Sequence, residues 1–283
     1  MIRFLRGDLQ VSLLDAGAFW LDGGAMFGVV PRPIWEKERT PDTRNRIRLG
    51  MNVVLIEDGH RRILVDTGAG TKWDPKYREI YGLSPRSPAE FLAPAGLAPG
   101  QIDLVVNTHL HFDHAGGNTE RNSRGEVVPS FPNARYVVQR GDLETARAGS
   151  ERTRASYLPE NFEPLLAEDR FELIDGPVMM GPGLELRPAP GHTPHMQILL
   201  IATPEGKLAF LADLVPTASH IPYPWVMGYD QEPLVTLATK RAILPDAARE
   251  GWVLLFEHDD MMPAATLEEK DGRLHARPVE PGA

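Results

Sequence analysis

Short apolar runs separated by polar turns dominate the chain, and this pattern is typical of β-strands. Residues 50 to 68, GMNVVLIEDGHRRILVDTG, contain two such runs around Asp58-Gly59, a pair of residues that strongly favours a hairpin turn. Another such pair, Asp271-Gly272, predicts a final hairpin in the tail ATLEEKDGRLHARP. Further strands are predicted in four apolar segments: IDLVVNTH from Ile102, LELRPAPGH, MQILLIATPEGKLAFLAD and GWVLLFEHDD.

Three segments favour helices instead. In SPAEFLAPAGL, Ser87 is placed to cap a helix and Pro88 occupies the first helical position. Residues 141–149 and the segment between Glu232 and Ala248 are also predicted as helices, whereas residues 150–170 are polar and irregular. Strand pairs that alternate with helices predict layered sheets covered by helices. Because no repeat or change of composition marks a linker, we expect a single domain over residues 1–283.

The charge balance narrows the classes of partner. The chain carries 39 Asp and Glu against 30 Lys and Arg, a formal net charge of -9, and has no run of basic residues. This balance argues against nucleic acid or an anionic membrane as a partner. The N-terminus, MIRFLRGDLQ, lacks the apolar core of a signal peptide, and no apolar stretch approaches the roughly 18 residues of a membrane span. A cytoplasmic location is therefore expected.

Histidine and aspartate crowd into one loop. The segment NTHLHFDHAGGN, residues 107 to 118, places His109, His111, Asp113 and His114 within six positions, although the chain has only nine histidines. Such groups gather where a cation holds them, and nitrogen with oxygen ligands suits a borderline metal such as zinc. The sequence contains no cysteine, so any metal site must use nitrogen and oxygen ligands.

Three more candidate ligands follow other apolar strands. His192 comes after LELRPAPG, Asp213 after KLAFLA and His258 after WVLLFE, just as His109 follows IDLVVNT. Buried strands thus deliver ionisable side chains to what we expect to be one end of the sheets, where loops carry function. Seven ligands suit two ions, and Asp213 is the natural bridge because Asp113 is tied locally to His114. One ion would bind His109, His111, His192 and Asp213, and the other Asp113, His114, His258 and Asp213.

The combination of HxHxDH, a distant PAPGH, an Asp ending FLAD and a late LFEH resembles the metallo-β-lactamase superfamily. The resemblance implies an α/β fold, an αββα sandwich of two facing mixed β-sheets with outer helices and a dinuclear site at one edge. It also implies that Asp66, in LVDTG, supports the metal-binding loops without binding metal itself.

Within this superfamily, GGAMFGVVPRPIW at 23 to 35 and NTHLHFDHAGGN are similar to the N-acyl homoserine lactonase and methyl-parathion hydrolase branch. This likeness implies a hydrolase of the quorum-quenching type. Two positions depart from that branch. The lactonases have a Tyr three residues after the bridging Asp, where this chain has Pro216, and their GHTPGH is shortened to GHTPH, so that His195 comes one residue early.

Two ions that share a water lower its pKa steeply, so a bridging hydroxide is the expected nucleophile. The substrate carbonyl or phosphoryl oxygen is then polarised by metal, and no Ser or Cys nucleophile is needed. Two carboxylates are expected to take part in the reaction. Asp213 bridges the two ions, and Asp113 is a candidate for taking or giving a proton. Zinc is the expected metal, and iron, manganese or cobalt would fit the same ligands.

Two segments are candidates for the substrate pocket. The Gly-rich stretch at 23 to 35 carries Met26 and Phe27 and is expected either to form a mobile apolar flap or to pack in the core. The stretch PTASHIPYPWVMGYD supplies Tyr223 and Trp225 as pocket residues, unless its aromatic residues simply pack. In place of the absent Tyr, Tyr223 or His220 is the candidate hydrogen-bond donor. Such a pocket favours a neutral ester or lactone.

The leading prediction is a metal-dependent hydrolase of lactones or related esters that also attacks organophosphate triesters. The alternatives are an organophosphate triester hydrolase, a general esterase, or a non-catalytic metal-binding scaffold. This chain has no basic C-terminal extension, as glyoxalase-type thioester hydrolases would need, and no added nucleic-acid module, as a nuclease would need. It also has no flavodoxin-like domain, which argues against the flavin-coupled relatives. True β-lactam hydrolases lack a bridging carboxylate such as Asp213, so that activity is not expected either. An apolar flap would also suit a homodimer contact.

Overall fold

The computed structural model describes residues 1–6 and 9–279, and the chain divides into two compact units. Of these residues, unit 1 contains 1–6, 9–17 and 51–176, and unit 2 contains 18–50 and 177–279. Strands β2 (Leu9–Asp22) and β3 (Arg46–Glu57) each begin in one unit and end in the other. The single domain expected over residues 1–283 stays a prediction.

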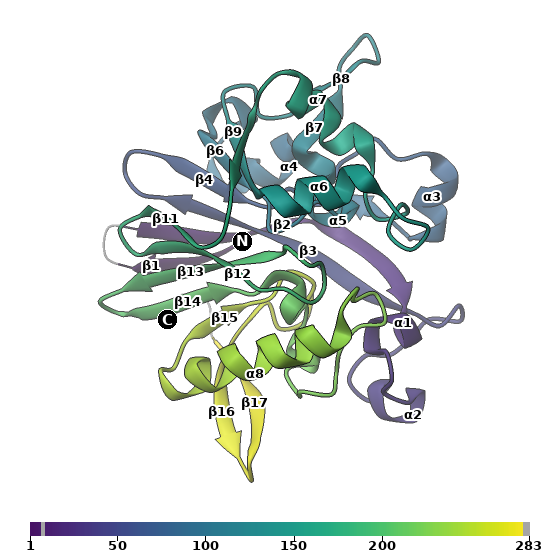
Figure 1. The fold of residues 1–283 in the computed structure, drawn as a ribbon, viewed down its shortest axis with the longest axis vertical. Coiled ribbons are helices and arrows are strands. Elements are labelled where there is room, and N and C mark those ends of the chain that lie inside the picture. The colour runs from purple at the N-terminus through teal and green to yellow at the C-terminus, as the bar shows by residue number, and fades with distance from the viewer. Residues whose placement is uncertain (7–8, 280–283) are drawn as a thin grey trace. The chain divides into compact units, whose positions relative to one another are not determined.

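Unit 1 is built on a mixed sheet with the strand order β1-β2-β3-β4-β6-β9-β10, and β5 pairs with β2. Its other strands are β1 (Ile2–Arg6), β4 (Arg62–Val65), β5 (Ser84–Pro85), β6 (Leu104–Val106), β9 (Arg135–Gln139) and β10 (Phe171–Ile174). A separate hairpin of β7 (Thr119–Arg121) and β8 (Val127–Pro129) protrudes from unit 1 (Figure 1).

The middle of this sheet explains where the first group of ligands lies. Strand β4 pairs in parallel with β6, and β6 in parallel with β9, so their carboxyl ends meet at one edge. All three strands are rich in Val, Leu and Ile and nearly completely buried, as expected for parallel strands covered on both faces. The residues that follow them are Asp66, the loop from Asn107, and the helix from Arg140.

Short helices complete unit 1: α3 (Pro75–Ile80), α4 (Pro88–Leu92), α5 (Phe112–Ala115), α6 (Arg140–Ala148) and α7 (Glu163–Ala167), with 3-10 turns at Ala93–Ala95, Pro99–Gln101, Gly116–Asn118 and Pro159–Asn161. The predicted cap of α4 is confirmed, because Ser87 Oγ accepts from Glu90 N and the Glu90 carboxylate accepts from Ser87 N. Residues 150–170 are more regular than expected, since α7 lies within them.

Unit 2 is built on a sheet with the order β11-β12-β13-β14-β15-β16-β17. The strands are β11 (Val178–Gly181), β12 (Leu184–Pro188), β13 (Gln197–Thr203), β14 (Gly206–Phe210), β15 (Val253–Leu255), β16 (Ala264–Lys270) and β17 (Arg273–Pro278). Neighbours are antiparallel except β14 and β15, which are parallel. Strands β12, β14 and β15 therefore point the same way, and the segments that follow them leave one edge.

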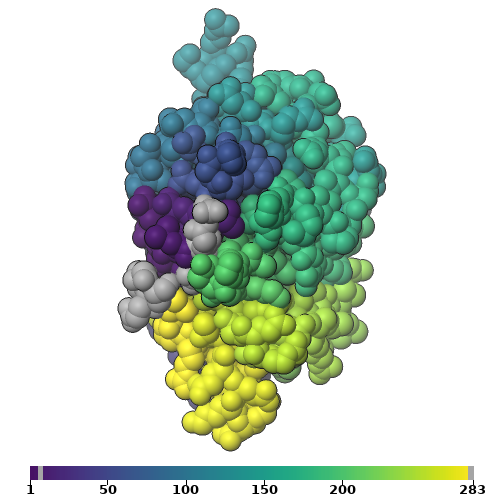
Figure 2. Space-filling model, turned by 90° about the vertical axis from the view of Figure 1, so that its left-hand side faces the viewer, coloured from purple at the N-terminus to yellow at the C-terminus, as the bar shows by residue number. Residues whose placement is uncertain are grey.

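The predicted C-terminal hairpin is confirmed. Lys270 pairs with Arg273, and the two turn residues Asp271 and Gly272 both have positive φ, of 53° and 70°. This is the backbone that a two-residue hairpin turn requires, and Asp-Gly adopts it readily. The hairpin of β16 and β17, yellow in Figure 2, stands out at the surface of unit 2.

The helices of unit 2 are α1 (Gly23–Phe27), α2 (Arg32–Trp35) and α8 (Pro233–Arg249), with 3-10 turns at Ala212–Leu214 and Ala218–His220. Helix α8 contacts β16 and matches the helix predicted between Glu232 and Ala248. Among the described residues, no helix is both long enough and apolar enough to cross a membrane.

Candidate metal centre

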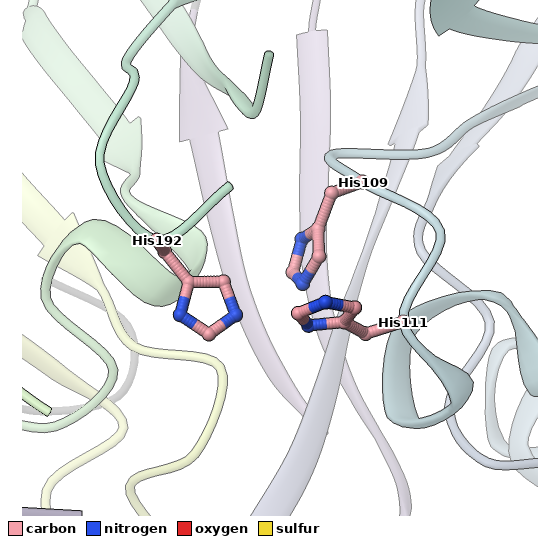
Figure 3. Close-up of side chains that lie close together, drawn as sticks. All are labelled: His109, His111 and His192. Atoms are coloured by element: carbon pink, nitrogen blue, oxygen red, sulfur yellow. The ribbon is translucent and has the colours of Figure 1, made fainter. Parts of the chain in front are cut away.

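The first group of candidate ligands lies in unit 1, where the chain leaves β6. His109 and His111 lie in the loop before α5, and Asp113 and His114 lie in α5 itself. All four side chains are buried. The His109 and His111 rings meet edge to face with centroids 4.5 Å apart, and the His109 and His114 centroids are 3.9 Å apart. Figure 3 shows His109 and His111 projecting from this loop, and it also draws His192.

Asp66 holds this loop from the end of the neighbouring strand, β4. Its carboxylate accepts hydrogen bonds from the backbone N and the hydroxyl of Thr108, at 2.8 and 2.6 Å, and contacts His114 Nδ1 at 3.1 Å. Asp66 itself has a φ of 58°, a left-handed conformation that is uncommon outside glycine. The structure therefore places Asp66 behind the candidate ligand His114, and this contact orients the His114 ring.

Two glycines allow the loops to approach each other closely. A Cβ on Gly116 would lie 2.2 Å from the carbonyl oxygen of Ala69, and one on Gly117 would lie 2.2 Å from that of Thr67. Only glycine fits at either position, because backbone atoms cannot move aside. The glycines of DHAGG therefore let the loop after β4 lie against the chain that follows His114.

A second carboxylate of unit 1 supports the same loop, and the sequence analysis did not single it out. Asp142 of α6 is fully buried and accepts from Leu110 N, between the two loop histidines, at 2.8 Å. Its other oxygen accepts from the Tyr157 hydroxyl at 3.3 Å, and the Tyr157 ring packs on His111 with centroids 4.6 Å apart. The segment GDLETARAG has the pattern of an ordinary helix and gives no sign of this role. The one available signal is its position directly after β9, which is parallel to β6 and ends at the same edge of the sheet.

The second group lies in unit 2, and Asp213 is at its centre. One Asp213 oxygen is 3.0 Å from His192 Nε2, and the other is 3.1 Å from His258 Nε2. The three side chains follow β12, β14 and β15, whose ends leave one edge of the sheet. All three are at least 94% buried as side chains. Within unit 2, the structure thus brings together three of the candidate ligands that the sequence analysis inferred from strand ends.

The contacts of Nδ1 show which nitrogen of each histidine carries a proton. His258 Nδ1 lies 2.8 Å from the carbonyl oxygen of Gly50, which can only accept, so Nδ1 carries the proton. His192 Nδ1 lies 2.9 Å from the Asp230 carboxylate and is a donor for the same reason. In its neutral form, each ring presents its Nε2 lone pair to an Asp213 oxygen. Facing lone pairs repel unless a cation lies between them, so the residues fit a bridged pair of metal ions.

Asp230 and Gly191 position His192. The sequence analysis did not select Asp230, which is 1% exposed and lies in the loop before α8. The backbone N of Gln231 also donates to the His192 carbonyl. Gly191 has a φ of 139°, and a Cβ there would lie 2.3 Å from Thr236 Oγ1. The start of α8 therefore packs directly against the PAPGH segment and fixes its histidine.

Comparison with known proteins identifies the superfamily of the chain. The sequence pattern described as the metallo-beta-lactamase superfamily matches residues 47–249, which is more than half of the chain. The chain belongs to the metallo-β-lactamase superfamily. Its two mixed sheets with helices are the fold of that superfamily, as the motifs predicted.

Curated relatives show which branch of the superfamily the chain resembles. An N-acyl homoserine lactonase from Bacillus cereus is 28% identical over 231 residues, which cover 76% of this chain and 83% of that protein. A second lactonase, from Bacillus sp, is 31% identical over 169 residues, and the match covers 58% of each chain. The superfamily member described here thus lies in the N-acyl homoserine lactonase-like branch.

Solved structures share the fold. A probable metal-dependent hydrolase from Staphylococcus aureus is 29% identical, with a TM-score of 0.88, over 98% of this chain and 100% of that one. The dizinc quorum-quenching lactonase AidC, in complex with a product, N-hexanoyl-L-homoserine, shares the fold at 19% identity and a TM-score of 0.80, over 98% of this chain and 97% of that one. The protein is accordingly a metal-dependent hydrolase.

The segment at 23 to 35, expected as a flap or as core, is packed within unit 2 of this superfamily member. Met26 is 1% exposed and Phe27 is completely buried. The Phe27 ring stacks on His220, with centroids 4.8 Å apart, and contacts Trp35 and Trp225. Of the two expectations for this segment, these contacts fit the core.

The two candidate donors of unit 2 differ in their contacts. His220 Nδ1 lies 2.8 Å from the Thr217 hydroxyl and Nε2 lies 2.9 Å from the Met26 carbonyl, and burial lowers the pKa of His220 to about 3. Tyr223 lies under the Arg241 guanidinium of α8, 5.7 Å from the ring centroid, and lines a hollow beside the β16–β17 turn. His220 therefore has no nitrogen left to meet a substrate, and Tyr223 faces α8.

Proposed function

We propose that this hydrolase opens the ring of N-acyl homoserine lactones at a dinuclear metal centre formed by the seven ligands. The observation that carries the proposal is the Asp213 carboxylate, whose two oxygens face the Nε2 atoms of His192 and His258 while both Nδ1 atoms are held by acceptors. A carboxylate in this position suits two ions that share it. Similarity to N-acyl homoserine lactonases supports the substrate class.

The proposed ligand sets are those inferred from the sequence. Zinc is the proposed metal, since a structural relative is a dizinc lactonase and imidazole with carboxylate suits zinc. When bound, the two ions supply a water of lowered pKa and polarise the substrate carbonyl. Hydrolysis would add the water oxygen to the carbonyl carbon of the lactone ring and break the bond from this carbon to the ring oxygen. One proton of the water would end on the released hydroxyl.

The protein's own residues hold this arrangement fixed. Asp66 and Asp142 orient the ligand loop of unit 1, while Asp230 and the Gly50 carbonyl fix the histidines of unit 2. Ligands held in this way need little reorganisation during the reaction. Asp113 stays a candidate for moving a proton between the attacking water and the leaving oxygen.

The test combines metal analysis with a panel of lactones. Elemental analysis should give about two ions per chain, and the loaded protein should hydrolyse N-acyl homoserine lactones. Asp213→Asn should loosen both ions together, whereas His258→Ala should loosen mainly one. A content of one ion, or loss of only one ion in Asp213→Asn, would contradict the bridged centre. A loaded protein that hydrolyses organophosphate triesters or simple esters but no lactone would contradict the substrate class.

A further inference from the structure

Unit 1 contains a cavity that the proposed reaction does not explain. Its volume is about 540 Å³, which suits a small organic molecule. The residues that line it include none of the seven candidate ligands. They do include five charged side chains, which a neutral lactone does not require: Lys72, Asp74, Arg121, Arg154 and Glu160. The cavity therefore indicates a ligand that carries a charge of its own.

The balance of these charges favours an anion. Arg121 and Glu160 pair with each other, with a guanidinium nitrogen 3.0 Å from a carboxylate oxygen. The Asp74 carboxylate caps α3 by accepting from the backbone N of Lys76. The Arg154 guanidinium, by contrast, forms neither an ion pair nor a hydrogen bond within residues 1–6 and 9–279. A guanidinium without a partner in the wall is suited to bind a carboxylate.

Lys72 adds a second cation whose charge is only partly compensated. Its ammonium group has three N–H donors, and two of them donate to the carbonyls of Gly116 and Thr119, at 2.5 and 2.7 Å. Both acceptors are neutral. Burial lowers the pKa of Lys72 to about 8, and the nearby Glu160 carboxylate opposes this shift only in part. An anion in the cavity would compensate the remaining charge and accept from the third N–H.

Asn161 supplies a neutral donor at the same wall. Its side chain lines the cavity and is buried, with 2% of the residue exposed, and its Nδ2 donates to no group among the described residues. A buried amide donor without an acceptor is costly unless a ligand supplies one. Arg154, Lys72 and Asn161 thus all offer donors. The complementary group is one that only accepts, and a carboxylate has this property.

The rest of the wall defines the body of the ligand. Three aromatic residues line the cavity, namely Trp73, Tyr77 and Tyr81. The rings of Tyr77 and Tyr81 are nearly parallel, with centroids 6.5 Å apart, and Trp73 meets Tyr81 edge to face at 5.9 Å. The indole N–H of Trp73 already donates to the Ala69 carbonyl, so its ring offers apolar surface. Flat aromatic groups pack well on rings arranged in this way.

We propose that this cavity is an accessory binding site for an organic anion in which one carboxylate is attached to an aromatic body. Arg154, Asn161 and the third N–H of Lys72 bind the carboxylate, while the three aromatic rings contact the body. A single carboxylate suits the site better than a doubly charged group, because Asp74 and Glu160 also line the wall. The site goes beyond the proposed lactone hydrolysis and does not depend on it.

The experiment compares two probes that differ in charge, 2-naphthoate and 2-naphthamide, by calorimetric titration of the metal-loaded protein. The acid should bind at least about 10-fold more tightly than the amide, because only the acid is charged. Arg154→Gln should weaken binding of the acid about 10-fold. Arg124→Gln is the matched control, because Arg124 is also exposed but does not line the cavity. It should change the affinity less than about twofold.

A second variant tests the buried donor. Asn161→Asp keeps the shape of the side chain but replaces the amide with a carboxylate, which repels the acid, so binding should again weaken at least about 10-fold. Its melting temperature shows whether the variant is folded, and Arg154→Gln tests the site independently because Arg154 is exposed.

Four results would overturn the proposal: no binding of 2-naphthoate to the wild type, equal affinity for the amide, equal losses in Arg154→Gln and Arg124→Gln, or wild-type affinity in Arg154→Gln. In the last case the acid binds elsewhere, for example at the metal ions. Wild-type affinity in a folded Asn161→Asp would likewise remove Asn161 from the site and contradict the proposal. Lactone hydrolysis enters none of these measurements, so the proposed function is tested separately.

Discussion

The chemistry of the candidate centre depends on the contacts of the histidine ring nitrogens that point away from it. His192 and His258 each use Nδ1 for an acceptor, Asp230 or the Gly50 carbonyl, and so turn Nε2, the metal-binding nitrogen of the neutral ring, towards Asp213. In unit 1, His114 Nδ1 contacts Asp66 in the same way. Acceptors of this kind set the tautomer and increase the basicity of the coordinating nitrogen. The candidate ligands and Asp66 were expected from the sequence, whereas Asp230 and the Gly50 carbonyl became visible only in the fold.

At this scale we predict that Asp142→Ala weakens metal binding although Asp142 is not a ligand. The change leaves Leu110 N buried without its acceptor and releases the loop that carries His109 and His111. The affinity for metal should fall about 10- to 100-fold in a competition titration with a chelator. Tyr157→Phe is the matched control and should have a smaller effect, because its hydrogen bond to Asp142 is long, at 3.3 Å, and the ring stays on His111. Unchanged affinity in Asp142→Ala would show that Asp142 does not position the loop.

At the scale of elements, the sequence predicted what local chemistry determines. The Ser87 cap, the Asp271-Gly272 turn and the strands before the ligands all depend on neighbouring residues, and they were found. The Asp58-Gly59 hairpin was also found, with a turn of four residues rather than two, because Asp58 accepts from the backbone of His60 and Arg61. Contacts between distant segments, such as that of Asp142 with the ligand loop, were not predictable, because no local pattern marks them.

The segment at 23 to 35 gives a prediction at the same scale. Phe27 is completely buried among Trp35, His220 and Trp225, so Phe27→Ala should create a cavity and lower the free energy of unfolding by about 3–5 kcal/mol. Denaturant unfolding measures this change. Val29→Ala is the matched control, because Val29 is 87% exposed and its loss should change stability by less than about 0.5 kcal/mol. Wild-type stability in Phe27→Ala, with a higher KM for long-chain lactones, would instead indicate a mobile flap.

At the scale of the whole molecule, stability should depend on pH through Lys240. This side chain is completely buried, and its Nζ donates to the carbonyls of His220, Pro222 and Trp225. Burial lowers the pKa of Lys240 from 10.5 to about 7, and Asp230 opposes this shift only in part. Between about pH 7 and 10.5 the unfolded chain therefore binds a proton that the native protein does not. Stability should rise with pH across this window, and the cost of charging Lys240 is fully present below it.

Lys240→Met removes this titration and tests it. The free energy of unfolding of the wild type, relative to the variant, should rise between about pH 7 and 10, by at most about 1.4 kcal/mol per pH unit. Taking the difference at each pH cancels the groups that the two proteins share. A difference that is constant over this range would contradict a lowered pKa for Lys240.

The packing of Phe27 against Trp225 also has a consequence for synthesis of the chain. The two residues are about 200 positions apart, so at 5–20 residues per second roughly 10–40 s separate their translation. The last residue of unit 1 is translated well before unit 2 can be completed. During that interval Phe27 has not yet met His220 and Trp225, so we expect the apolar side chains at 23 to 35 to be exposed on the ribosome.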